Sequence, residues 1–355
     1  MATEQFLLGL DGYVLALIIS VTAWAVTCCF GTFTNLVNIH AFLKIKVKDS
    51  VTLTFLVLSI SDLGMVVVGF MTSATHAMAV MEMKNQAWFP IEPYGLAMIS
   101  NFIREQFLTI SALITTYQAV ARCMCVTIPL RFRDVFTMSR TTVILCVFVS
   151  VSFLPYIPLV VGLRLVHFRI GEGNSTRLTR HLSRLFYISS DVLEMLNDVL
   201  VNLISVGLVI ICLFVMLHKL RQAASFRRLS QATGRSVTAI AGSKVLSSRD
   251  IQVLKQVALI STAYVISNTP RMCIVFMRMA EPEFYVNRKY RRVFHVCVCV
   301  KIALELICAS TNIFIYYSYN SKYRDLLRSL FSSFLSQSNT EKSQCSSRSG
   351  KGNSF

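Results

Sequence analysis

Apolar residues occur in seven long runs along the chain, separated by short polar stretches. About 20 residues suffice for a helix to cross the hydrocarbon core of a bilayer, and each run is long enough. Isolated polar residues within the runs are costly in lipid, so we expect them to face the interior of a helix bundle. The runs are 14–43, 51–81, 94–126, 141–163, 186–217, 251–279 and 293–319.

The composition favours a membrane protein over a soluble one. Apolar residues make up 54% of the 355 residues and charged residues only 15%, whereas soluble domains are usually about 25% charged. No metal-ligand spacing or phosphate-binding loop is present, so the sequence gives no support for an enzyme. We therefore expect an all-α membrane protein that does no covalent chemistry.

The net charge of +17 is high enough to suggest a nucleic-acid partner, but its distribution indicates a membrane topology instead. Four segments, 44–49, 122–140, 218–256 and 320–355, hold 21 basic and five acidic residues, a net charge of +16. The rest of the chain holds 14 basic and 13 acidic residues. Basic residues collect in cytoplasmic loops, so we place these segments in the cytoplasm, the N-terminus outside, and expect no nucleic-acid partner.

The loops and ends of the chain fit this topology. The lone glycosylation sequon, at Asn174, falls in the second external loop. Residues 320–335 repeat apolar positions at helical spacing, which predicts an amphipathic helix lying on the inner-leaflet lipids. The Ser-rich residues 336–355 predict a disordered cytoplasmic tail. Residues 1–13 are then an extracellular N-terminus, without the pattern of a cleaved signal peptide, and 14–319 form the membrane domain.

Short motifs in several runs resemble those of rhodopsin-like (class A) G-protein-coupled receptors. The resemblance covers about residues 14–335, and each motif lies in the run where the family carries it. The motifs are Asn35, Leu58-Ser59-Ile60-Ser61-Asp62, Ala121-Arg122-Cys123 followed by Pro129-Leu130-Arg131-Phe132, Ser267-Asn268-Thr269-Pro270, and Asn312-Ile313-Phe314-Ile315-Tyr316.

The chain also departs from the family pattern. It lacks the cysteine that the family usually carries at the outer end of the third run (94–126), near Ala97, and it lacks the partner of that cysteine in the second external loop. We therefore expect this loop to be less constrained than in most relatives. The tryptophan usual in the fourth run and the proline usual in the fifth run are missing. In the sixth run, Asn268 stands where the family carries the tryptophan known as its toggle switch. The chain therefore looks like a divergent branch, similar to invertebrate neuropeptide (FMRFamide-receptor-like) and molluscan chemosensory receptors.

The resemblance implies a seven-transmembrane helix bundle with an amphipathic eighth helix in the plasma membrane. Such a receptor transmits the binding of an extracellular ligand, here a short peptide or chemosensory cue, to a heterotrimeric G protein. Arrestin and a receptor kinase are implied cytoplasmic partners, and Ser230, which follows two arginines, resembles a phosphorylation site. A polytopic transporter or channel is the alternative.

The resemblance also implies an activation switch. Arg122 is expected to meet the G protein, and Ala121 stands where a neighbouring carboxylate usually pairs with that arginine. We therefore expect a single bridge from Arg122 to Asp250; the alternative is that Arg122 extends to lipid phosphate. Pro270 should kink its helix, and Tyr316 should help to hold the open state.

Asp62, Ser111 and Asn312 match the sodium-site positions of the family. A carboxylate in the middle of the membrane is retained when it is paired, and a Na⁺ ion bound there would stabilise the inactive state. The alternative is a hydrogen-bonded polar core without an ion. No other cofactor is implied.

Further charged residues are expected to line a ligand cavity. Arg104 stands where amine receptors carry an aspartate, which argues against a monoamine, and Leu306 stands where opsins carry their lysine. Arg104 and Arg271 could hold a ligand carboxylate through bidentate hydrogen bonds; the alternative is that the charged groups neutralise one another across helices. The residues expected at the cavity are Arg104, Glu105, Asp191, Glu194, Asp198, Asn268, Arg271 and Glu305, with Lys301 and Asn202 nearby and 191, 194, 198 and 202 forming one helical stripe.

A first prediction follows for Arg104. Arg104→Ala should weaken the potency of an agonist while surface expression stays normal, because the variant loses a contact to the ligand and not the fold. Dose–response curves together with surface labelling measure both quantities, and an unchanged potency would contradict the assignment.

Overall fold

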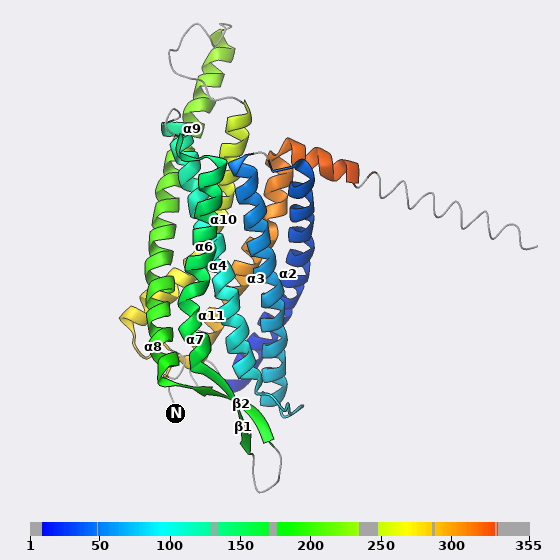
Figure 1. Ribbon diagram of the computed structural model, residues 1–355, viewed down its shortest axis with the longest axis vertical. Helices are drawn as coiled ribbons and strands as arrows, with labels where there is room; N and C mark the ends of the chain where they lie inside the picture. Colours follow the sequence, from blue (N-terminus) through cyan, green and yellow to red (C-terminus); the bar gives the residue numbers. More distant parts are fainter. Residues whose placement is uncertain are drawn as a thin grey trace, which may run out of the picture.

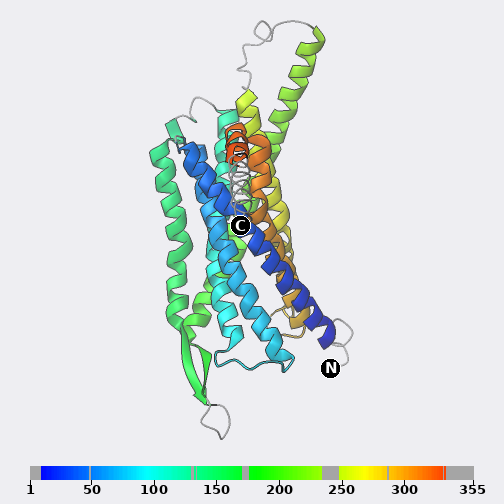
Figure 2. The same ribbon diagram turned by 90° about the vertical axis from the view of Figure 1, so that its right-hand side faces the viewer.

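The computed structural model describes residues 9–47, 49–128, 132, 134–169, 176–233, 248–285, 288–330 and 332. Long helices run side by side and form an elongated bundle, with a small hairpin at one end (Figures 1 and 2). The elements are α2 (Leu10–Ile45), α3 (Ser50–Met83), α4 (Pro93–Thr127), α6 (Met138–Phe153), η1 (Leu154–Tyr156), α7 (Ile157–Gly162), β1 (Leu163–Arg169), β2 (Thr176–Leu182), α8 (Arg184–Leu193), η2 (Glu194–Val201), α9 (Asn202–Thr233), α10 (Ser248–Ala280) and α11 (Arg291–Tyr319).

Several helical segments are suited to cross a membrane. Among the described residues, five are long and apolar enough to do so: α2, α3, α6 to α7, α8 to residue 222 in α9, and α11. The prediction of a helical, multi-pass membrane protein is therefore confirmed. Helices α4 and α10, of 35 and 33 residues, carry charged side chains within the bundle. Helix α4 packs against α3, α6, α9 and α10, so it lies at the centre of the arrangement.

Two of the predicted helical runs are interrupted. The run 141–163 passes from α6 through the 3₁₀ turn η1 into α7, where Pro155 and Pro158 each remove a backbone N–H donor. The run 186–217 passes from α8 through the eight-residue π-helix η2 into α9. Since a π-helix closes its hydrogen bonds over five residues, η2 changes the direction in which later side chains point.

Polar side chains fasten α2 to α11. Asn35 Nδ2 donates to the carbonyl of Ala309 at 3.0 Å, Thr34 Oγ1 donates to that of Ser310 at 3.0 Å, and Trp24 Nε1 donates to that of Cys299 at 3.2 Å. Gly31 allows the close approach, because a Cβ there would collide with the Ser310 side chain. Lipid offers no competing hydrogen bonds, so these contacts fix how the helices pair.

The segment predicted to be the second external loop contains an antiparallel hairpin of β1 and β2, paired from Leu163 with Leu182 to Arg169 with Thr176. It docks on the α3–α4 connection through two backbone hydrogen bonds. Leu178 N donates to Pro90 O at 2.8 Å, and Glu92 N donates to Leu178 O at 2.9 Å. The chain thus adds a small β-element to the helical fold that the sequence predicted.

Two arginines of β2 hold the same contact in place. Arg177 Nη2 binds both carboxylate oxygens of Glu82 at 2.7 and 2.8 Å. Arg180 N donates to Glu92 Oε2 at 3.2 Å, and its guanidinium lies 4.7 Å from the centre of the Tyr94 ring. We call these contacts the hairpin clasp. Ion pairs and backbone pairing thus constrain the hairpin without a disulfide, and the expectation that this loop is less constrained than in most relatives stays a prediction.

At the opposite end of the bundle, residues 321–330 form a helix that packs on the bundle itself (Figure 1). Tyr323 is fully buried, and its hydroxyl donates to Asn38 Oδ1 at 2.5 Å. Its ring lies against Phe42 and Tyr316. Burial raises the pKa of Tyr323, so the phenol stays protonated as a donor. The apolar stripe that predicted lipid contact therefore also anchors this helix to α2 and α11.

Asn35→Ala should lower the free energy of unfolding by about 1–2 kcal/mol, because it removes the inter-helix hydrogen bond that the buried Ala309 carbonyl accepts in addition to its bond within α11. Thermal unfolding of the detergent-solubilised protein measures the loss. Thr22→Ala is the control, since that exposed hydroxyl bonds only Ile18 of its own helix. Equal effects of the two substitutions would contradict the role given to Asn35.

Candidate functional site

Five charged side chains meet within the bundle, and we call them the charge cluster: Arg104 and Glu105 of α4, Arg271 of α10, and Lys301 and Glu305 of α11. Arg104 Nη1 binds Glu305 Oε2 at 2.7 Å, and Arg104 Nη2 binds Glu105 Oε1 at 2.5 Å. Lys301 Nζ lies 3.0 Å from Glu105 Oε1 and 3.9 Å from Glu305 Oε1. Arg271 Nη2 binds Glu105 Oε2. The cluster therefore ties three helices together.

The cluster has an inner and an outer part. The side chains of Arg104 and Glu305 are fully buried, whereas those of Glu105 and Lys301 keep 12% and 11% of their surface accessible. Every guanidinium nitrogen of Arg104 is engaged, because Nε and Nη2 also donate to Asn101 Oδ1 at 3.2 and 3.1 Å. The described contacts of Arg104 thus join it to side chains of α4 and α11. A ligand role for Arg104 stays a prediction.

Helical spacing explains how the cluster is assembled. Asn101 lies one turn before Arg104, and Lys301 lies one turn before Glu305, so each pair shares one face of its helix. Asn101 was not among the residues predicted at the cavity, although its position three residues before Arg104 is the signal that could have identified it. The spacing of residues within one helix does not show which face of α4 meets which face of α11.

Glu194 belongs to a different cluster, between η2, the end of α10 and the loop after it. Its carboxylate binds Arg278 Nη1 and accepts a hydrogen bond of 3.2 Å from the Tyr285 hydroxyl. The Arg278 guanidinium lies 4.3 Å from the centre of the Tyr285 ring. Burial and the Glu194 carboxylate raise the pKa of Tyr285 to about 12, so the hydroxyl stays a donor. No described contact joins Glu194 to the charge cluster.

The predicted stripe of Asp191, Glu194, Asp198 and Asn202 is wrong as a single face. Asp191 is exposed, whereas Asn202 is buried and donates to the sulfur of Met272 at 3.2 Å. The π-helix η2 lies between them and rotates the later residues away from the direction expected of an α-helix. The side chain of Asp198 lies outside the described residues.

Asn268 is buried, and its amide is used within α10. Asn268 Nδ2 donates to Tyr264 O at 2.9 Å, and the hydroxyls of Ser267 and Thr269 also donate to carbonyls of the same turn. Pro270, which has no N–H, follows directly, and α10 continues through it. These side chains bond carbonyls of the turn that the proline disturbs. A ligand contact of Asn268 stays a prediction.

Asp62, Ser111 and Asn312 come together as predicted, at the meeting of α3, α4 and α11. Ser111 Oγ donates to Asp62 Oδ1 at 2.7 Å, and Asn312 Nδ2 donates to Asp62 Oδ2 at 2.8 Å. Carboxylate and hydroxyl oxygens suit a hard cation, and the same contacts also form a satisfied polar core. Among the described residues, no three His, Cys, Asp or Glu side chains gather to hold a metal ion. The sodium ion therefore stays a prediction.

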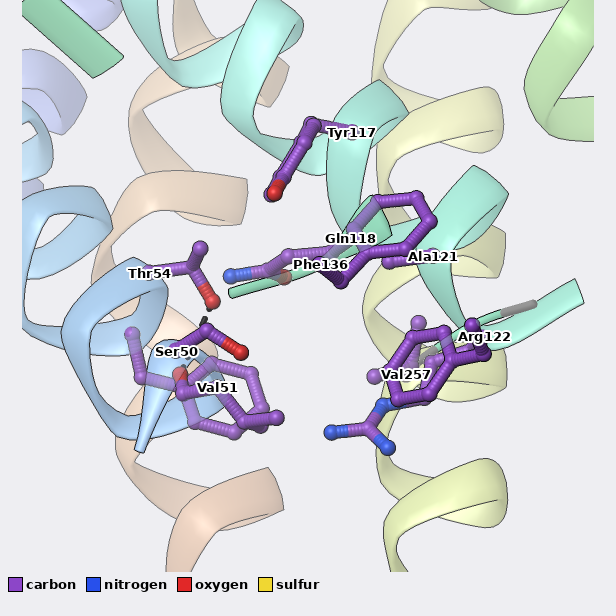
Figure 3. A pocket seen from close by; sticks show the side chains of 11 residues that line it. Ser50, Val51, Thr54, Tyr117, Gln118, Ala121, Arg122, Phe136 and Val257 are labelled. Atoms are coloured by element: carbon purple, nitrogen blue, oxygen red, sulfur yellow. Dashed lines mark hydrogen bonds between the residues drawn. The ribbon is translucent and has the colours of Figure 1, made fainter. Parts of the chain in front are cut away.

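A small cavity lies between the start of α3, the end of α4 and α10. Figure 3 shows the side chains that line it. The Arg122 guanidinium points into it, together with the amide of Gln118, one turn earlier on α4. Gln118 is buried, and neither of its amide atoms has a hydrogen-bond partner among the described residues. The volume is about 20 Å³, enough for about one water molecule. The other lining residues are Ser50, Val51, Thr54, Phe55, Tyr117, Ala121, Phe132, Phe136 and Val257.

The remaining predicted residues fall into two groups. Tyr316 is fully buried, with its ring in contact with Phe42 and Phe55. The side chains of Asp250 and Ser230 and the whole of Asn174 lie outside the described residues. The Arg122–Asp250 bridge and the two modification sites therefore stay predictions.

The sequence matches no protein-family model and no curated protein. The chemistry of the site therefore rests on the contacts described above.

The buried pair should show a strong energetic coupling. Arg104→Met or Glu305→Leu alone should lower the free energy of unfolding by about 3–5 kcal/mol, because each leaves a buried charge without its partner. The double variant should lose less than the sum, and thermal unfolding of all four proteins measures the coupling. Strictly additive losses would contradict a direct pair.

The geometry also changes the earlier expectation for Arg104→Ala. Its surface expression should fall, because the substitution leaves Glu305 buried without its partner.

Proposed function

We propose that the protein is a G-protein-coupled receptor of the plasma membrane. In this proposal α4 and α10 cross the membrane with the five apolar segments, which gives seven spans with an extracellular N-terminus. The helix at 321–330 is the amphipathic eighth helix on the inner leaflet. The basic segments at the end of the bundle that holds the Arg122 cavity support this orientation, because cytoplasmic loops are rich in Lys and Arg.

A column of buried polar groups along α4 and α11 carries the proposal. It begins at the charge cluster, passes the Asp62 carboxylate with its Ser111 and Asn312 donors, and continues toward Tyr316 and Arg122. Buried polar groups in a membrane protein are costly and mark functional pathways. A column that links the hairpin end with the opposite end is what a receptor needs to relay ligand binding.

The small cavity at Arg122 supports a closed, inactive conformation. Among the described residues the cavity has room for about one water molecule, so in this proposal coupling to a G protein requires the surrounding helices to separate. Pro270 interrupts the hydrogen bonds of α10 and gives that helix a place to bend. A ligand shifts the equilibrium only if it binds the open form more tightly.

The ligand in this proposal is a short peptide or a chemosensory cue with a charged group. The accessible edge of the charge cluster supports a charged ligand, since charged partners in a low-dielectric site interact strongly. Na⁺ bound at Asp62 would act as an allosteric ion that favours the closed state. Arrestin and a receptor kinase would act on the cytoplasmic tail.

The competing proposal is a polytopic transporter or channel. The same buried polar column could line a path for a solute, and the two functions differ in what they require. A transporter moves solute without a G protein, and a receptor activates a G protein without net flux. A Gα-dissociation screen in transfected cells, run with short peptides and small anions beside a solute-uptake assay, distinguishes them. Uptake without Gα dissociation, at confirmed surface expression, would favour the transporter.

Asp250→Asn should raise ligand-independent Gα dissociation several-fold, because it removes the only predicted partner that holds Arg122 in the closed state. Energy transfer between labelled Gα and Gβγ, normalised to surface expression, measures this activity. Asp325→Asn is the matched control, since it removes an exposed cytoplasmic carboxylate of the interfacial helix. The same rise in both variants would show a general charge effect and not a switch.

A further inference from the structure

We propose that the Glu105 carboxylate is a built-in competitor for an anionic ligand: the outer part of the charge cluster binds a ligand carboxylate, which displaces Glu105 from Arg271 and Lys301. The binding step is independent of the proposed receptor function. Only the consequence for signalling rests on that function.

The contacts of Glu105 are those expected of a bound anion. Its Oε1 lies 2.5 Å from Arg104 Nη2 and 3.0 Å from Lys301 Nζ, and its Oε2 binds Arg271 Nη2. Three cations from three helices therefore converge on one carboxylate. Arginine and lysine donors arranged in this way recognise carboxylates strongly, because charge-assisted hydrogen bonds are stronger than neutral ones.

The two acids of the cluster differ in how easily they can be replaced. The Glu305 side chain is fully buried with Arg104, and Asn101 occupies further donors of that arginine. Displacing Glu305 would leave a buried charge unpaired. The Glu105 side chain keeps 12% of its surface accessible, and so does Lys301 at 11%. A solute therefore reaches the outer carboxylate and its cations while the inner pair stays intact.

The exchange has a structural consequence. Glu105 joins Arg271 of α10 to α4, so a ligand carboxylate that takes the place of Glu105 at Arg271 breaks that link. The Arg104–Glu305 pair continues to hold α4 to α11. Anion binding should therefore weaken the attachment of α10, the helix that contains Pro270, to α4 at this point.

The test uses the purified full-length protein with acetate as the probe and acetamide as its neutral isostere. Glu105→Gln removes the competing charge at nearly constant size, so the midpoint of thermal unfolding should rise at acetate concentrations about tenfold lower than in the unmodified protein. Acetamide should have no effect on either protein. Asp325→Asn is the matched control, because it removes one exposed carboxylate outside the cluster and should not tighten acetate binding.

Two further variants keep the test decisive. The double variant Glu105→Gln with Lys301→Met should abolish the acetate response. It removes one of the cations to which acetate would bind in place of Glu105. Glu105→Asp keeps the competing charge and should retain the weak response of the unmodified protein, even if Glu105→Gln fails to fold. A tightened response to acetate in the Glu105→Gln protein supports the proposal. An equal response in all variants, or an equal response to acetamide, overturns it.

Signalling is measured separately in cells. Glu105→Gln should raise basal Gα dissociation, because the link between α4 and α10 is lost, whereas Asp325→Asn, which removes an exposed carboxylate outside the cluster, should not. Acetate binding without any Gα response would refute the receptor function and leave the competitor site standing. A Gα response without tightened acetate binding would refute the competitor site and leave the receptor function standing.

Discussion

Five charged side chains lie inside a helix bundle that faces lipid, and neither lipid nor a dry interior can solvate them. They must therefore solvate one another, and this requirement fixes the relative positions of α4, α10 and α11. Helix α4 contributes both an arginine and a glutamate to the cluster, and it also packs on α3, α6 and α9. The geometry of the bundle thus depends on one helix whose charged face cannot turn toward lipid.

Around this cluster, polar contacts hold the helices and the hairpin in place, as a disulfide or a hydrophobic core does in other proteins. Asn35 and Thr34 bind carbonyls of α11, and the hairpin clasp attaches the β1–β2 hairpin to the α3–α4 connection. Each contact is modest in water, but in the membrane segments no solvent competes for the same groups. The chain therefore reaches a defined packing although, among the described residues, all of its cysteines are free.

The same helices connect the two ends of the molecule. Residues of α4 occur in the charge cluster, in the Asp62 group through Ser111, and at the cavity through Arg122. Residues of α11 occur in the first two and in the aromatic contacts of Tyr316. A change in the pairing of α10 at the charge cluster therefore has a direct physical route to the cavity, through the packing of α10 on α4 and α11.

The sequence by itself determined the helical runs, the membrane environment and the uneven distribution of charge, because hydrophobicity and loop charge act locally along the chain. It also indicated the meeting of Asp62, Ser111 and Asn312 through its resemblance to a receptor family. Only the tertiary structure decided that Arg104 is saturated by Asn101 and Glu305, that η2 rotates Asn202 away from Asp191, and that β1 and β2 form a hairpin docked on the α3–α4 connection. These outcomes depend on the depth and rotation of each helix against its neighbours, and the spacing of residues within one helix contains neither.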